Sequence, residues 1–135
     1  MIYKFDPVIY PRKIWITYDA TVEELNKRFP EGFVENDNHI PFKEIDESSY
    51  ATVYATRETE PKEEAGFLIR FSKKESMTTA NITHESIHCA SGIFRYIGAD
   101  IDNVNDEPFA YLCGFIAKCC QEVYDKVNEL EEMKS

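Results

Sequence analysis

The sequence has fewer positive than negative charges and no long hydrophobic run. Its 135 residues include 15 Lys and Arg against 25 Asp and Glu, which gives a formal net charge of −10. A surface this acidic repels polyanions, so we expect no binding to DNA or RNA. No stretch approaches the length of a membrane span, and residues 1–11 lack the apolar core of a signal peptide. We therefore expect a cytoplasmic protein with no membrane partner.

Cysteine is scarce, and its spacing is not that of a thiolate metal site. The four cysteines are Cys89, Cys113, Cys119 and Cys120. None of them belongs to a pair with the two-residue gap that lets two thiolates converge on one zinc ion. Each lies among apolar neighbours in a stretch with helical periodicity. We therefore predict reduced thiols that pack in a hydrophobic core.

Apolar and aromatic residues are present in the amounts that a single folded domain needs. They make up 43% and 13% of the chain, respectively. A chain of this length buries one core and leaves too little for a second one. The sequence therefore predicts one domain over residues 1–135.

The first half of the chain shows strand patterns. Runs of β-branched and aromatic residues, typical of strands, lie at residues 2–5, 8–18, 50–57 and 66–72. The last two runs are joined by a turn-rich stretch with Pro61, which predicts an antiparallel hairpin. Before them, Thr21 is followed three residues later by Glu24, a capping box that predicts a short helix ending near Phe29. Residues 31–49 read as a loop.

The second half of the chain changes to helical periodicity. One helix is predicted over residues 78–97, with Gly98 as its stop signal, and a longer one over residues 106–132. Pro108 falls in the first turn of the longer helix, where the missing N–H has no cost. The predicted fold class is therefore α+β: a small antiparallel β-sheet or hairpin, then one helix, then a long C-terminal helix.

The strongest motif is an H-E-x-x-H sequence on the first of these two helices. His84 and His88 lie four residues apart, on one face of the helix, where both imidazoles can reach one tetrahedral zinc ion. Glu85 is rotated aside from that face and can hold a water molecule activated by the zinc. The three residues therefore predict a zinc-activated nucleophile with Glu85 as its general base.

The surroundings of the motif favour a cleft over a solvated surface. His84 and His88 share their stripe with the polar residues Asn81, Ser91 and Arg95, while apolar residues cover most of the remaining circumference. So wide an apolar arc predicts a largely buried helix. A polar stripe on such a helix is expected to face a cleft or a metal ion.

A catalytic zinc ion needs a third protein ligand, and Glu107 is the leading candidate. It lies nineteen residues after His88, at the start of the second helix. Its carboxylate reaches the histidine pair only if the two helices cross at a steep angle. Three other carboxylates, Asp100, Asp102 and Asp106, lie within reach of the same loop and are alternatives.

This arrangement resembles the zincin metallopeptidases, in their gluzincin pattern. The resemblance covers Met77 to about Gly114 and consists of H-E-x-x-H on one helix and a glutamate about twenty residues further on. It implies a zincin-like fold, a zinc cofactor, and a peptide or protein substrate. By the same resemblance, the metal ligands are His84, His88 and Glu107, and the base is Glu85.

The sequence departs from related patterns at several positions. A metzincin has Gly and His where this chain has Ser91 and Phe94. The larger gluzincins have an Asp at the position of Tyr111, so the group that orients His84 is open between Asn81, Asp102 and a backbone carbonyl. Tyr111 is the candidate to stabilise the oxyanion of the reaction; His39 is a second one, but its place in a loop favours an ordinary loop histidine.

The leading functional prediction is a minimal zinc-dependent metallopeptidase that hydrolyses a peptide bond. We expect the strand at residues 66–72 to form a sheet edge that pairs with an extended peptide. One alternative is a non-catalytic zinc-binding or protein-interaction module that retains a zincin-like fold. Another is a helical interaction module in which the motif is accidental. The sequence specifies neither the substrate nor the oligomeric state.

Overall fold

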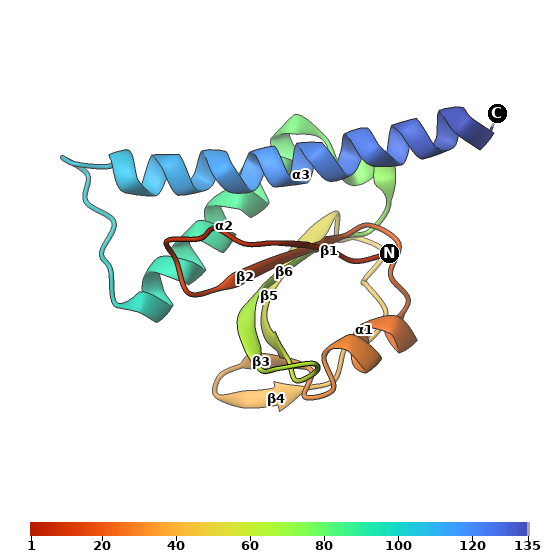
Figure 1. The fold of residues 1–135 in the computed structure, drawn as a ribbon, viewed down its shortest axis with the longest axis horizontal. Helices are drawn as coiled ribbons and strands as arrows, with labels where there is room; N and C mark the ends of the chain where they lie inside the picture. The colour runs from red at the N-terminus through yellow and green to blue at the C-terminus, as the bar shows by residue number, and fades with distance from the viewer. Residues whose placement is uncertain (135) are drawn as a thin grey trace.

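The computed structural model describes residues 1–134, and Ser135 lies outside the described residues. Within residues 1–134, six strands form one sheet, and three α-helices pack on its two faces (Figure 1). The predicted α+β class, with a long C-terminal helix, is confirmed. In chain order the elements are β1 (Tyr3–Phe5), β2 (Lys13–Thr17), α1 (Val22–Arg28), β3 (Phe33–Glu35), β4 (Asn38–Ile40), β5 (Ala51–Glu58), β6 (Glu64–Phe71), a 3₁₀ turn (Lys74–Ser76), α2 (Thr79–Ile97) and α3 (Glu107–Lys134).

The sheet is larger than predicted and mixed in direction. Its strand order is β1-β2-β6-β5-β3-β4, with β2 and β6 parallel and the other neighbours antiparallel. The predicted hairpin of β5 and β6 is confirmed, with a register that runs from Ala51 opposite Phe71 to Glu58 opposite Glu64. The predicted edge position of β6 is wrong, because β6 pairs with β2 on one side and β5 on the other. An interior strand is buried on both faces, which explains its nearly continuous apolar sequence.

The segment predicted as a loop at residues 31–49 contains a second, short hairpin. β3 and β4 pair antiparallel around a turn at Asn36 and Asp37, whose φ values are 51° and 64°. Asn and Asp adopt this left-handed backbone conformation more readily than most residues, and the turn type suits a two-residue hairpin. Strands of three residues are too short to show a period of two, which is why the sequence pattern missed them. The run at residues 8–18 is also shorter than predicted, since β2 begins at Lys13.

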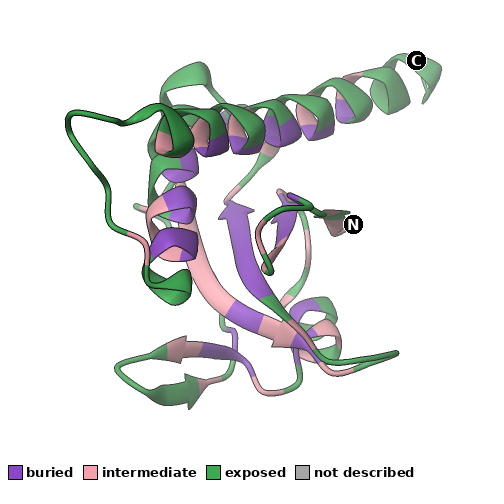
Figure 2. Cartoon of the chain, turned by 60° about the vertical axis from the view of Figure 1, so that its left-hand side comes forward, coloured by how far each residue is buried: buried purple, intermediate pink, exposed green. Residues whose placement is uncertain are grey.

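The sheet separates two hydrophobic cores. Ile14 and Ile16 of β2 face α2 and α3, whereas Trp15 between them faces α1 and the segment around Phe42. Figure 2 shows the buried strand β6 beside the long, half-buried β5, with α2 to one side of both. Alternate side chains of the central strands therefore hold helices on opposite faces.

The helix boundaries follow the signals in the sequence closely. The capping box of Thr21 and Glu24 is present at the start of α1. Thr78 caps α2, and Gly98 ends it in the left-handed conformation at φ 74°. Within residues 1–134, no helix combines the length and the apolar character that a membrane crossing requires.

The long helix α3 buries one stripe and then extends beyond the sheet. Its buried side chains are Leu112, Ile116, Cys119, Cys120, Val123 and Val127. Leu130, which the sequence placed on the same stripe, is 43% exposed, because the last turns project past the rest of the molecule (Figure 1). The four cysteines are free thiols, and Cys89, Cys119 and Cys120 are buried as predicted.

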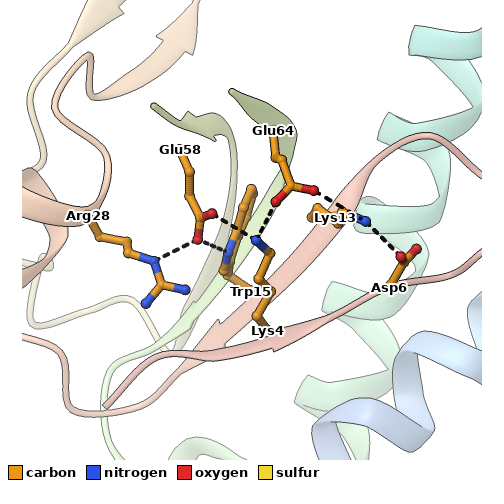
Figure 3. A network of polar contacts seen from close by, with 7 residues as sticks. All are labelled: Lys4, Asp6, Lys13, Trp15, Arg28, Glu58 and Glu64. Carbon is orange, nitrogen blue, oxygen red and sulfur yellow. Dashed lines mark hydrogen bonds and ion pairs between the residues drawn. The ribbon is translucent and has the colours of Figure 1, made fainter. Parts of the chain in front are cut away.

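A polar network around Glu58 connects several elements at the C-terminal end of β5. The carboxylate of Glu58 is 2% exposed and accepts hydrogen bonds from Trp15 Nε1 at 2.8 Å, Arg28 Nε at 2.6 Å and Lys4 Nζ at 2.8 Å (Figure 3). Lys4 also donates to Glu64 at 2.8 Å. The donors come from β1, β2 and α1, so this one carboxylate joins three elements to the end of β5.

Candidate active site

Helix α2 lies close against the sheet because of a glycine. Gly92 faces Phe67 of β6, and a Cβ atom placed on Gly92 would lie 2.6 Å from the Cε1 atom of that ring. Real Cβ atoms do not approach another heavy atom so closely, so a larger residue here would displace either the Phe67 ring or the helix. The buried residues Ile82, Cys89 and Ile93 face the main core on the same helix. This packing fixes which side of α2 is left open.

The open side of α2 carries the two histidines of the motif. The Nε2 atoms of His84 and His88 are 3.1 Å apart, and the ring centroids are 4.7 Å apart with the planes inclined at 69°. The side chain of His84 is 66% exposed. The pair arises from local sequence alone, because residues four apart on a helix lie one above the other. Both imidazoles are therefore accessible and already converge.

The histidines line a cleft of about 1070 Å³ between α2, β5 and the β3–β4 hairpin. On the sheet side, β5 contributes Ala51, Val53 and Ala55, whose small or medium side chains leave the space open. Asn36 and Asp37, at the tip of the hairpin, face the same space. Further lining comes from Val34, Thr52, Phe67, Glu85, Ser91, Gly92, Arg95 and Tyr96. The polar stripe predicted on α2 thus borders a cleft.

Glu85 lines this cleft and is mostly buried. The residue is 8% exposed, and its Oε1 atom is 4.0 Å from Nε2 of His84. Among the described residues its carboxylate accepts no hydrogen bond. Burial raises the pKa of Glu85 above its ordinary value, although positive charge on His84 and His88 would lower it. The residue is therefore a desolvated carboxylate beside two imidazoles.

Family models, curated proteins and solved structures give no match to this chain. The similarity to zincins accordingly rests on the motif and on its spacing from Glu107.

The structure does not bring Glu107 and Tyr111 to the cleft. Glu107 is exposed in the first turn of α3, and Tyr111 is 75% exposed one turn later. Phe109 between them packs on Phe94, with ring centroids 5.4 Å apart. The start of α3 therefore lies beside the C-terminal part of α2, more than one helical turn beyond His88. Residues 1–134 hold no group of three or more His, Cys, Asp or Glu side chains arranged for a metal ion. The third ligand remains a prediction.

The alternative site residues have other surroundings. Asp100 lines a small hollow that shares Ser91 and Arg95 with the cleft. Asp102 accepts backbone N–H groups within its own loop, at 2.8 Å from Val104 and 3.3 Å from Asn105. Asp106 is exposed at the start of α3. None of these carboxylates lines the cleft beside the histidines.

The predicted supporting residues also have other contacts. Asn81 donates through Nδ2 to the carbonyl of Ser76 at 2.8 Å, so this amide holds the start of α2. His39 belongs to β4 and lines the neighbouring pocket with Arg12 and Tyr96. The cleft residues that the sequence pattern missed are Asn36 and Asp37, because the hairpin that presents them was predicted as loop. The adjacent Asn and Asp were the turn signal that could have revealed it.

Proposed function

We propose that this chain is a zinc-dependent peptidase with a zincin-like site, in which His84 and His88 bind the metal and Glu85 acts as the general base. The observation that carries the proposal is the convergence of two exposed imidazoles beside a desolvated carboxylate in a large cleft. We further propose a cytoplasmic location, which the four unpaired thiols support.

The histidine pair has the spacing that a shared zinc ion needs. Two nitrogens bound at about 2.0 to 2.1 Å to one tetrahedral zinc lie about 3.3 to 3.4 Å apart. The observed separation of 3.1 Å is slightly shorter than this, so neither side chain has to move far to bind a shared zinc ion. Glu107 is proposed as the third ligand, with Asp100, Asp102 and Asp106 as alternatives, and α3 or its preceding loop would have to approach α2. Zinc held by these residues would supply a Lewis acid that polarises a peptide carbonyl.

Glu85 has the properties of a general base. A carboxylate without hydrogen-bond donors keeps its lone pairs available for a proton, and a pKa raised toward neutrality improves proton transfer near pH 7. In the proposed reaction, an Oε atom of Glu85 takes a proton from the attacking water and passes it to the leaving amine nitrogen. A cleavage site beside the carboxylate therefore needs no other acid or base.

The free edge of β5 is proposed to hold the substrate, in place of β6. β3 pairs with β5 only at Ala55 and Thr56, so within residues 1–134 the outer edge of β5 at Ala51–Tyr54 has no strand beside it. The backbone carbonyl of Tyr50 accepts a hydrogen bond from the N–H of Ser72, which directly follows β6. Alternate residues of an antiparallel strand direct their backbone groups to opposite neighbours, so Ala51 and Val53 point theirs to the free edge. An extended peptide paired there would run along the cleft beside the histidines.

A zinc titration tests the metal site. We expect purified, metal-free protein to bind one zinc ion, and His84→Ala or His88→Ala to weaken binding by at least about 100-fold. His39→Ala is the matched control, because it removes the third histidine from outside the cleft. Binding below about 0.1 zinc per chain in the unaltered protein would leave only an interaction module as the function.

Cleavage of a peptide library tests the catalytic assignment. We expect the zinc-loaded protein to cleave peptides and Glu85→Gln to lose at least about 100-fold in rate while it keeps its zinc. If zinc binds but no peptide is cleaved, the chain is a non-catalytic zinc-binding module. Cleavage at an unchanged rate by Glu85→Gln would show that Glu85 is not the base.

A further inference from the structure

The cleft continues past the histidines into a second pocket. The neighbouring pocket, of about 230 Å³, shares Val34, Ala55, Phe67 and Tyr96 with the main cleft. It lies beyond the point where β3 joins β5, next to the C-terminal part of α2. The two pockets therefore form one continuous surface, with the histidines at one end and Arg12 in the second pocket.

Two arginines on this surface have no acidic partner. Arg95 lines the main cleft and Arg12 lines the second pocket, and among residues 1–134 neither guanidinium forms an ion pair. Asp100 lines the hollow on the other side of Arg95, yet it forms no ion pair with it. A third arginine, Arg57, is already bound to Glu31 at 3.1 Å.

Arg12 is held in place by aromatic contacts rather than by a carboxylate. Its guanidinium carbon lies 5.5 Å from the centroid of Tyr96, and the Tyr96 ring in turn packs edge-on against Phe67. One amino group, Nη1, donates to the carbonyl of Pro11 at 2.7 Å. A guanidinium has five N–H donors, so four remain for a ligand. A guanidinium that packs on an aromatic ring and has free donors is well suited to bind a carboxylate.

The spacing along α2 relates these cations to the proposed cleavage site. Arg95 follows His88 by seven residues, which is about two turns and returns to the same helix face, about 10 Å further along. An extended peptide advances about 3.3 Å per residue. A peptide bond beside His84 and His88 therefore places Arg95 about three residues away.

We propose that Arg12 and Arg95 form a carboxylate-binding subsite that selects peptides with an acidic residue, or a C-terminal carboxylate, about three residues from the cleaved bond. The position of the cleaved bond rests on the proposed peptidase function. Binding of the carboxylate itself does not, since it requires only the two guanidinium groups.

Peptide binding to the full chain carrying Glu85→Gln, without metal, tests the subsite. The probes are fluorescent alanine–serine peptides, each with one glutamate or with glutamine in its place, and with an amide at the C-terminus. We expect glutamate to strengthen binding by about tenfold, a value at the low end for charged hydrogen bonds because Arg95 is exposed. A further pair, without glutamate, compares a free C-terminal acid with the amide and distinguishes the two sources of carboxylate.

Substitutions then locate the effect. We expect Arg12→Gln and Arg95→Gln each to reduce the preference for carboxylate to within about twofold, and Lys118→Gln, on the exposed surface of α3, to leave it unchanged. Circular dichroism checks that each variant is folded. Equal binding of the acidic and neutral peptides to the protein that retains both arginines would overturn the proposal. A preference for the acidic peptide that persists in both arginine variants would also overturn it.

Cleavage by the zinc-loaded chain with Glu85 intact separates the two proposals. If acidic peptides bind through Arg95 but are never cleaved, the peptidase proposal fails and the subsite stands. If peptides are cleaved with no preference for a carboxylate, the subsite fails and the peptidase proposal stands.

Discussion

Two carboxylates, Glu58 and Glu85, are withdrawn from water to a similar degree but have opposite surroundings. Glu58 is 2% exposed and accepts hydrogen bonds from Trp15, Arg28 and Lys4 (Figure 3). Glu85 is 8% exposed, and among the described residues its carboxylate accepts none.

The two environments move the pKa of each group in opposite directions. Burial alone would raise the pKa of Glu58, but the hydrogen bonds from Lys4 and Arg28 outweigh it, and the pKa is lowered. At Glu85 burial dominates and the pKa is raised. A buried carboxylate surrounded by donors stabilises the fold in its charged form, whereas one left without donors destabilises it and is available for proton transfer.

The largest expected effect comes from removing the paired carboxylate. We expect Glu58→Ala to lower the free energy of unfolding by about 3 kcal/mol, because it breaks a buried ion pair and leaves Trp15 Nε1 without its acceptor. Urea denaturation measures this. Glu64→Ala, in the same network but less buried, is the control and should lose less than about 1 kcal/mol. An equal loss in both variants would contradict the central role of Glu58.

Acidification should remove the stabilising charge of Glu58 while its side chain stays in place. Because the pKa of Glu58 is lowered on folding, its stabilising effect is fully present above the ordinary carboxyl pKa of about 4.3. It is then lost as the pH falls through the lowered pKa. We expect the stability difference between the unaltered protein and Glu58→Gln to be constant near pH 7 and to shrink below about pH 4. A difference independent of pH would contradict the charged role of Glu58.

The smallest expected change in the free energy of unfolding is at Glu85, the carboxylate without hydrogen-bond donors, and it has the opposite sign to the change at Glu58. We expect Glu85→Gln, measured at pH 7 with a chelator present, to raise the free energy of unfolding by up to about 1 kcal/mol, because a desolvated charge is removed and no donor is lost. His84→Ala is the matched comparison and should change stability by less than about 0.5 kcal/mol, since its side chain is exposed. A marked loss of stability in Glu85→Gln would mean that Glu85 has a structural role.

The features that local sequence encodes were predictable. The capping box of Thr21 and Glu24, the stop at Gly98, and the hairpin of β5 and β6 are all present. Each depends on residues close together in the chain. The short β3–β4 hairpin was missed because three-residue strands show no usable period, and only its Asn36–Asp37 turn carried a signal.

The positions that depend on distant contacts were not predictable in the same way. The interior place of β6 follows from its parallel pairing with β2, which is more than forty residues away in the chain. Neither the periodicity of β6 nor its turn residues specify that partner. Likewise, the spacing of Glu107 from His88 predicts a shared ligand set, while the structure has α3 begin beside Phe94.

Local sequence is sufficient to produce the pair of converging imidazoles, because helical periodicity brings residues four apart to one face whatever surrounds them. The helix that carries them was equally set by its own cap and stop residues. The burial of Glu85 and the cleft beside the histidine pair, in contrast, depend on long-range packing. Burial and free space depend on how α2 packs against β5 and β6, and that packing is decided by side chains such as Phe67, which lie far away in the sequence.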